Sequence, residues 1–431
     1  MNTAFRILII IILVGSITTL SFAQVADSLR ELQRQIHILA GEIERLKLGE
    51  VADDRYEPQR GLGPAAARVY QLKKSGVSLA GYGEVVYENY SATRQDGRES
   101  KKLDQIDFLR NIIYVGFRYN DWILFNSEIE FEHASTGKTD AKGKSIGEVS
   151  VEFAYVELMF TRQLNLRAGM ILPPVGIINE KHEPSTFFGA LRPQVERSVI
   201  PTTWRANGIG VYGELSPSLD YRLYLVEGLN ASQFADSDGI RGGRQSGAKA
   251  LAEDLGLTGK LEYTGVSGLL LGGSFFLGDA GQGMTDSLGS IDAQTRVLSF
   301  HTEFVWGGLE LRGLYARTDI GDAGRISRLN GKSVGSRLTG WYVVGGYDIM
   351  PWIMPGSLQT LAPYVQYERL NTHDAVPSGF VANNAHDITI LTTGVGYKPH
   401  PNVAFKIDYR DVQNAAQTGV SQWNVALNYL F

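Results

Sequence analysis

The chain contains no cysteine among its 431 residues. Disulfide bonds, thiolate metal sites and a thiol nucleophile are therefore excluded. Long apolar runs are also missing: beyond residue 23 no stretch approaches 18 consecutive apolar residues, so the pattern predicts no membrane-spanning helix. Neither sign of charge is in large excess, because the formal net charge is only −5. A slightly acidic chain of this kind argues against nucleic acid as a partner.

Catalytic motifs around the histidines are absent as well. His133, His182, His301 and His386 belong to no His-Glu-x-x-His or Gly-x-Ser-x-Gly motif. We therefore expect a protein that is not an enzyme and that has neither a cofactor nor a metal site.

The N-terminus has the three-part layout of a secretory signal peptide, expected at residues 1–23. Arg6 precedes an apolar run from Ile7 to Val14, and the small residues Ser21 and Ala23 follow it. This layout predicts cleavage between Ala23 and Gln24. The apolar run is too short for a membrane helix, which needs ~20 residues. We therefore expect an exported chain.

A heptad repeat follows and predicts a coiled-coil helix at residues 24–50. Its a and d positions are Leu29, Leu32, Ile36, Leu39, Ile43 and Leu46. This composition favours two helices, and a single amphipathic helix on the rim of a larger domain is the alternative interpretation. Residues 51–76 carry Pro, Gly and Ala without a sustained period, and we expect a linker there.

From Val77 onwards the apolar residues alternate with polar ones, as in β-strands. In the last strand, Trp423, Val425 and Leu427 share one face, and Asn424 and Ala426 share the other. Sixteen such strands are expected, starting near Val77, Asp104, Trp122, Glu148, Leu164, Trp204, Asp220, Gly256, Leu269, Arg296, Leu309, Leu338, Leu361, Asp387, Asn402 and Ser421.

The connections between these strands alternate between long and short. A water-soluble sandwich also has alternating strands, but it has no reason for this rhythm of loops. Short turns alternating with long outer loops are what a membrane barrel predicts. The expected fold is all-β: a transmembrane antiparallel β-barrel of about 16 strands at residues 77–431, preceded by the helical segment. An even strand number places both barrel ends, and the helical segment, in the periplasm.

A barrel of this size leaves an aqueous channel, whose lining charges set its selectivity. Alternation places eight basic and eight acidic side chains on the inner wall. The basic ones are Arg110, Arg118, Arg167, Arg222, Lys260, Arg312, Lys406 and Arg410, and the acidic ones are Glu128, Glu130, Glu132, Glu214, Glu262, Glu303, Glu310 and Asp408. Cross-strand pairing that merely keeps the wall polar is the alternative to a selective role for any of them.

The third long loop, Pro173–Thr203, is the longest, and its apolar content predicts that it is buried against the inner wall. Its basic residues, together with one just beyond it, are the expected constriction residues: Lys181, Arg192, Arg197 and Arg205. Glu180, Glu183 and Glu196 share the loop. The small excess of positive charge predicts a weak anion preference.

Three stretches carry a resemblance to a known family: Met170–Gly176, the run from Asn179 to Arg205, and Gly81–Glu84. They look like the phosphate-selective porin O and P family and related outer-membrane porins. The resemblance implies a trimeric sixteen-stranded barrel that passes anions through arginines of the third loop and inner wall. The acidic stripe of Glu128, Glu130 and Glu132 departs from a strongly anion-selective wall.

These features together predict an outer-membrane porin in a Gram-negative-type bacterium, a channel for passive diffusion of small hydrophilic solutes and ion transport, with phosphate as a candidate anion. Its expected partners are outer-membrane lipid, further copies of the chain in a trimer or dimer, and the assembly machinery, for which Phe431 resembles the terminal signal. The alternative is a structural barrel, anchored to a periplasmic partner through the coiled coil, in which the pore is incidental.

Overall fold

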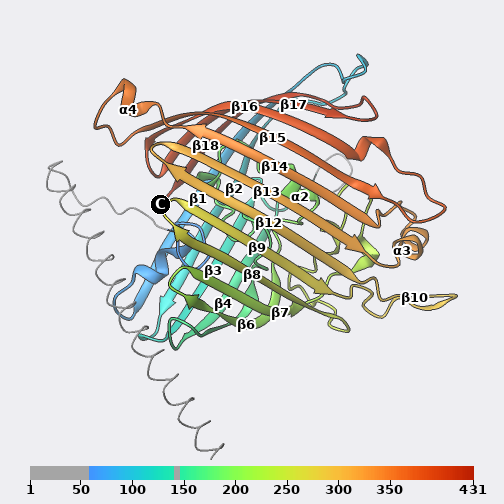
Figure 1. Cartoon of the computed structure of the whole chain (residues 1–431), viewed down its shortest axis with the longest axis horizontal. Helices are drawn as coiled ribbons and strands as arrows, with labels where there is room; N and C mark the ends of the chain where they lie inside the picture. The colour runs from blue at the N-terminus through green and yellow to red at the C-terminus, as the bar shows by residue number, and fades with distance from the viewer. Residues whose placement is uncertain (1–57, 140–145) are drawn as a thin grey trace, which may run out of the picture. The chain divides into compact units, whose positions relative to one another are not determined.

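The computed structural model describes residues 58–139 and 146–431. Sixteen strands form one closed antiparallel barrel, in which each strand pairs with its neighbours along the chain and the last pairs with the first (Figure 1). They are β1 (Gly76–Tyr90), β2 (Gln105–Arg118), β3 (Ile123–Glu132), β4 (Val149–Met159), β5 (Asn165–Ile171), β6 (Ala206–Ser216), β7 (Leu219–Glu227), β8 (Leu255–Val266), β9 (Leu269–Gly278), β12 (Thr295–Trp306), β13 (Leu309–Ile320), β14 (Arg337–Tyr347), β15 (Thr360–Ala375), β16 (Asp387–His400), β17 (Val403–Asn414) and β18 (Gln422–Leu430).

Short elements lie in the connections. A hairpin of β10 (Thr285–Asp286) and β11 (Gly289–Ser290) joins β9 to β12. The helical turns are η1 (Ala66–Gln71), η2 (Pro184–Thr186), α2 (Gln194–Ser198), η3 (Ala231–Gln233), η4 (Arg241–Gly243), α3 (Ala323–Asn330), α4 (Met350–Ile353) and η5 (Asn384–His386). None of the helices in the described ranges has the length and apolarity to cross a membrane.

The expected barrel of sixteen strands is confirmed, and the sandwich alternative is wrong, because the sheet closes on itself. Long and short connections alternate as expected. The exception is 348–359, a longer connection that holds α4 at the end of the barrel that otherwise carries the short turns; α3 and the β10–β11 hairpin lie at the opposite end (Figure 1). We call these the short-turn end and the long-loop end.

The outer face of the barrel carries apolar side chains, and its inner face carries many charged and polar side chains beside buried apolar ones. On β18, Trp423 is 52% exposed, whereas its inward-facing neighbour Asn424 is 0% exposed. Most of the inner-wall charges named above are buried, including Arg167, Arg222, Lys260 and Asp408. Such an outer surface is what strands facing lipid require.

The segment expected to be a linker is packed inside the barrel where the structure describes it. Residues 62–67 are buried, and η1 contacts β1, β2 and β3. Gly116 on the inner face of β2 has no side chain, and Val69 occupies the space where its Cβ would lie. The apolar residues of this segment fill the lumen, so its lack of period does not make it an exposed connector. The predicted signal peptide and coiled coil lie outside the described residues.

Candidate functional site: the filled lumen

The third long loop, residues 172–205 between β5 and β6, lies inside the barrel and reaches several parts of the wall. Its backbone amides donate hydrogen bonds to the Ser274 hydroxyl (from Gly176, 3.0 Å), to Asp408 (from Ala190, 2.7 Å) and to Glu368 (from Val195, 3.2 Å). These acceptors stand on β9, β17 and β15. The expectation of a loop buried against the inner wall is confirmed by these contacts.

Lys406 on β17 holds the middle of this loop. Its ammonium group donates to the carbonyl oxygens of Pro184 at 2.5 Å, Phe187 at 2.7 Å and Gly189 at 3.0 Å. An ammonium has three hydrogens, so all of its donors are used. The sequence placed Lys406 on the inner wall, but nothing in its neighbourhood along the chain shows that its partners lie more than 200 residues away.

Glu196 fastens the loop to itself and to the wall. Its carboxylate accepts hydrogen bonds from the backbone amides of Ile177 (2.9 Å) and Ile178 (2.7 Å), and from the hydroxyl of Tyr342 on β14 (2.6 Å). Burial raises the pKa of Glu196 to about 6, and these three donors act in the opposite direction. From the sequence alone, Glu196 is one of three acidic residues of this loop, and nothing there indicates these hydrogen bonds.

The four expected constriction residues do not form one group. Lys181 pairs with Glu303 at 3.1 Å, and Arg205 is ion-paired with Glu152. Arg192 donates to the carbonyl oxygen of His182 at 3.1 Å, whereas Arg197 is exposed. Two of the four are therefore neutralised by wall carboxylates.

Two arginines of the fourth long loop, residues 228–254, join Arg192, Arg197 and Arg205. Burial and the neighbouring guanidinium of Arg244 lower the pKa of Arg241, and Arg197 and Arg192 act in the same direction. Arg244 donates to the carbonyls of Pro201 and Thr203 in the third loop, the former at 3.3 Å. Nη1 of Arg241 is buried and has no hydrogen-bond partner in the described part of the chain. We call these five residues the arginine cluster.

Arg241 and Arg244 are not among the residues expected from the sequence, because they lie in a different loop from the one expected to narrow the channel. Their signal in the sequence is the pair Arg241 and Arg244, which together with Lys249 are the basic positions of an otherwise Gly- and Ser-rich stretch. Only the packing of the two loops brings these guanidiniums together.

The predicted wall residues lie on the inner face and are mostly paired. Arg110 lies between Glu84 (3.2 Å) and Glu130 (3.9 Å), and Arg167 pairs with Glu157 at 2.6 Å. Arg118 donates to a turn carbonyl, that of Asp121, at 3.2 Å. Glu128 is buried against His182, and Glu132 is half-buried. Pairing of this kind leaves the wall polar without a strong net charge.

The buried N-terminal segment, residues 58–72, meets the third loop at Glu183. The Glu183 carboxylate accepts the backbone amides of Ala65 (3.1 Å) and Ala66 (2.9 Å). On the wall, Asn126 donates to the Ala66 carbonyl at 2.9 Å, and Tyr70 donates to Glu157 at 2.9 Å. The segment and the loop therefore occupy the lumen together.

One motif that the expectation of no enzyme overlooked is Gly-x-Ser-x-Gly at Gly331–Gly335. It lies between α3 and β14 rather than at a strand-to-helix turn, the context that a nucleophilic serine of this motif requires. The nearby His373 uses Nε2 on the carbonyl oxygen of Ser333 (2.8 Å) and Nδ1 on the amide of Asn383 (3.0 Å). Neither ring nitrogen is left to activate the hydroxyl.

Comparison with known proteins identifies one relative by sequence and several by fold. The chain is 36% identical over 347 residues to an uncharacterized protein of Aquifex aeolicus, covering 78% of this chain and 76% of the relative. No family model matches. The barrel is similar to the outer membrane channel DcaP of Acinetobacter baumannii (TM-score 0.53, 13% identity, 83% of this chain and 98% of that chain). It is also similar to OmpF of Salmonella typhi (TM-score 0.51, 14% identity, 83% and 98%) and to a loop-deletion mutant of OmpT, an outer membrane protein of Vibrio cholerae (TM-score 0.51, 12% identity, 83% and 100%). At these identities the likeness establishes a shared fold.

Proposed function

We propose that this chain, which belongs to the same family as the uncharacterized Aquifex aeolicus protein, is an outer-membrane porin for small hydrophilic solutes. Its barrel fold, which is similar to that of an outer membrane channel, supports the proposal. The observation that carries the proposal is the barrel of sixteen strands with an apolar outside and a charged inside. An apolar outer surface suits lipid, and a wide barrel with a polar lining suits an aqueous path. The proposal includes insertion by the assembly machinery and a homo-oligomer, with a trimer expected from the porin resemblance.

A weak anion preference is part of the proposal, and the arginine cluster supports it. Five guanidiniums gather where the third and fourth long loops meet, and within residues 58–139 and 146–431 Arg205 is the one that has a carboxylate partner in an ion pair. Crowded like charges repel one another, so an anion that enters the cluster relieves the repulsion. Phosphate stays a candidate solute on the basis of the family resemblance alone.

The test of the channel is conductance in planar bilayers, followed by the reversal potential across a salt gradient. We expect large conductance steps, and a reversal potential that shows a weak preference for anions over cations. Replacing Arg241 and Arg244 by Ala should shift the reversal potential towards cations, and so should replacing Arg192 and Arg197. The shift should shrink as salt rises, because screening limits each charge to ~8–10 Å.

The matched control replaces Arg94 and Arg98 by Ala. Both arginines lie in the first long loop and pair with Asp96, and the side chain of Arg98 is 81% exposed. This control should leave the reversal potential unchanged. If both cluster variants also leave it unchanged at low salt, the cluster does not select ions, and the stripe of Glu128, Glu130 and Glu132 becomes the candidate selecting element.

A second function, a structural barrel anchored to a periplasmic partner, is favoured by a different observation. Residues 58–72 and the third long loop both occupy the lumen, as expected of a barrel whose pore is incidental. The bilayer measurement separates the two functions, because a plugged anchor gives no conductance steps.

A further inference from the structure

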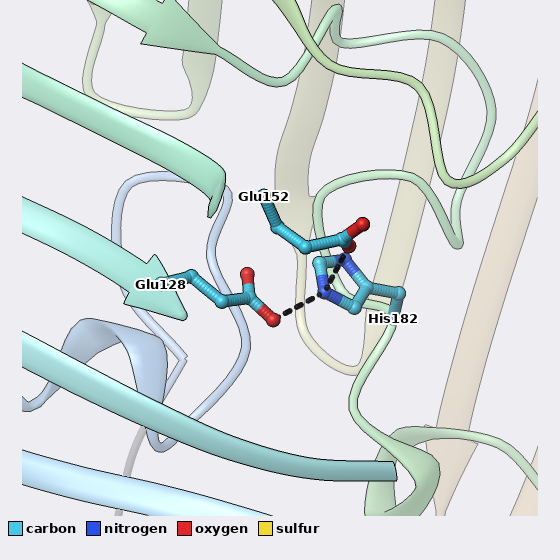
Figure 2. A group of neighbouring side chains, drawn as sticks. All are labelled: Glu128, Glu152 and His182. Carbon is cyan, nitrogen blue, oxygen red and sulfur yellow. Dashed lines mark hydrogen bonds and ion pairs between the residues drawn. The ribbon is translucent and has the colours of Figure 1, made fainter. Parts of the chain in front are cut away.

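Three side chains outside the arginine cluster meet inside the lumen. Glu128 comes from β3, Glu152 from β4 and His182 from the third long loop, and Figure 2 shows both carboxylates turned towards one edge of the imidazole. Nε2 of His182 lies 3.0 Å from Oε1 of Glu128 and 3.6 Å from Oε2 of Glu152. One ligand atom from each residue lies within 4.8 Å of the others, and the three residues are at most 2% exposed.

Two carboxylate oxygens of this group lack a hydrogen-bond donor among the described residues. Oε2 of Glu128 and Oε2 of Glu152 are buried, and neither has a hydrogen-bond partner within the described ranges. A buried carboxylate oxygen without a donor is costly, and such an atom calls for a cation or a proton. Since Oε2 of Glu152 is also the oxygen 3.6 Å from Nε2, it points into the group rather than away from it.

The orientation of His182 is fixed by the backbone. Its Nδ1 lies 3.0 Å from the carbonyl oxygen of Asn179, which can only accept, so Nδ1 carries a hydrogen. In the neutral ring the remaining lone pair is then on Nε2, which faces the two carboxylates. A histidine that donates its other N–H to a backbone carbonyl is the usual arrangement behind a metal ligand.

We propose that Glu128, Glu152 and His182 form a binding site for a divalent transition-metal ion such as Zn²⁺. Zinc takes imidazole nitrogen and carboxylate oxygen at about 2.0–2.2 Å, so neighbouring ligands of a tetrahedral ion lie about 3.3 Å apart. The distances of 3.0 Å and 3.6 Å lie on either side of this value. The ion takes the place that a second proton on His182 would otherwise fill.

The surrounding charges moderate the affinity. Arg205 is ion-paired with Oε1 of Glu152, which leaves Oε2 of that residue for the ion. Arg192 adds a positive charge beside His182, whose carbonyl oxygen it contacts at 3.1 Å, and Glu130 lies beside Glu152 on the same wall. With neutral His182, the carboxylates of Glu128, Glu130 and Glu152 together with the guanidiniums of Arg192 and Arg205 carry one net negative charge, and a dication changes this to one net positive charge. The site therefore suits an exchangeable ion that joins β3, β4 and the third loop.

Cobalt(II) titration of the purified full-length protein in detergent tests the site, since Co²⁺ bound by nitrogen and oxygen ligands gives visible absorption bands. We expect saturable binding of one ion per chain that Zn²⁺ displaces. His182→Gln and Glu128→Gln keep similar volume and polarity, and each should weaken binding at least tenfold. Folding of each variant is checked by the heat-modifiable mobility of the barrel.

The matched control is His301→Gln, which changes another buried lumen histidine that faces a single carboxylate, Glu262, at 3.5 Å. This control should bind Co²⁺ as the unchanged protein does. The site is refuted if the unchanged protein shows no saturable bands, or if folded His182→Gln and Glu128→Gln bind Co²⁺ as tightly as it does. Equal loss in His301→Gln would also overturn the assignment, because binding would then not depend on this particular histidine.

Discussion

At the scale of single residues, Glu196 makes the stability of the third long loop depend on pH. Its folded pKa of about 6 lies above the ordinary value of 4.5. The closed loop therefore binds more protons than an opened loop between these values, and its stability falls as pH rises through this window. The difference of about 1.5 pKa units corresponds to about 2 kcal/mol, which is present below about pH 4.5 and lost above about pH 6.

We expect the amides of Ile177 and Ile178, which donate to Glu196, to show larger hydrogen-exchange protection factors at pH 4.5 than at pH 7. Glu196→Gln cannot titrate, so it should abolish this difference while keeping an acceptor for part of the network. An equal pH dependence in Glu196→Gln would assign the effect to another group.

Lys406 offers a second test at this scale. Lys406→Met keeps the length of the side chain but leaves the carbonyls of Pro184, Phe187 and Gly189 without this donor. Each buried carbonyl left unpaired costs about 1–3 kcal/mol, so we expect the loop to become sensitive to protease while the barrel stays intact. The control is Lys398→Met, because Lys398 makes one long bond to the same loop, 3.3 Å to Ser185. Equal protease resistance of the two variants would show that Lys406 does not hold the loop.

The sequence predicted which residues face the lumen but not which of them are free. Alternation assigns a face to every strand residue, and Arg110, Arg167 and Glu128, which it assigns to the inner face, are buried. Contacts between a loop and the wall, or between two loops, follow no such periodic pattern in the sequence. Lys181 contacts Glu303, and Arg244 contacts the third long loop, only in the folded chain. The group of Glu128, Glu152 and His182 likewise comes from three separate segments of the sequence.

At the scale of elements, residues 58–72 lie against the inner wall of the barrel, and we expect them to narrow the proposed channel. Deleting Gln59–Gln71 removes the contacts of Ala65 and Ala66 with Glu183 and of Tyr70 with Glu157. Since β1 begins at Gly76, the hydrogen bonds of the barrel are untouched. We expect a larger single-channel conductance with an unchanged strand-dominated circular dichroism spectrum. Conductance equal to that of the full chain would show that these residues do not obstruct the path.

A matched variant isolates the contact from the length of the chain. Glu183→Gln keeps the volume but weakens acceptance of the two backbone amides, because a neutral amide oxygen is a poorer acceptor than a carboxylate. It should raise the conductance less than the deletion does. The sequence did not predict this element, since Pro and Gly at its start indicate a turn, while burial of Ala65–Ala67 and Val69 depends on a lumen formed by residues far along the chain.

At the scale of the whole molecule, the barrel could be predicted because its information is local. Each strand carries its own alternation, each short turn fixes the pairing of its two strands, and closure follows because lipid cannot satisfy the backbone groups of an open strand edge. The connection that broke the rhythm, 348–359, has the Pro- and Trp-containing α4, which adds length without altering the pairing of β14 with β15. The coiled coil, outside the described residues, stays a prediction.

Phe431 extends the pairing of β1 with β18 by one residue, and the final prediction concerns this residue. Its amide donates to the carbonyl of Gly81 at 2.9 Å, and the Gly81 amide donates back to the Phe431 carbonyl at 2.8 Å. The Phe431 ring lies where a Cβ on Gly81 would be, 2.5 Å from that position. The residue therefore contributes two backbone hydrogen bonds to the seam between β1 and β18, and an aromatic ring on its surface.

Two variants separate the contribution of the backbone hydrogen bonds between Phe431 and Gly81 from the contribution of the aromatic ring. Deleting Phe431 removes both, whereas Phe431→Ala removes only the ring, and the two lost hydrogen bonds are each worth about 0.5–1.5 kcal/mol. If the terminal aromatic is the assembly signal, both variants should lower the folded yield in membranes several-fold, because the signal precedes closure. The control Phe405→Ala removes another outward-facing ring, on β17, and should insert normally. Normal insertion of Phe431→Ala beside a defective deletion would assign the role of Phe431 to the seam instead, since only the hydrogen-bonded closure would then depend on it.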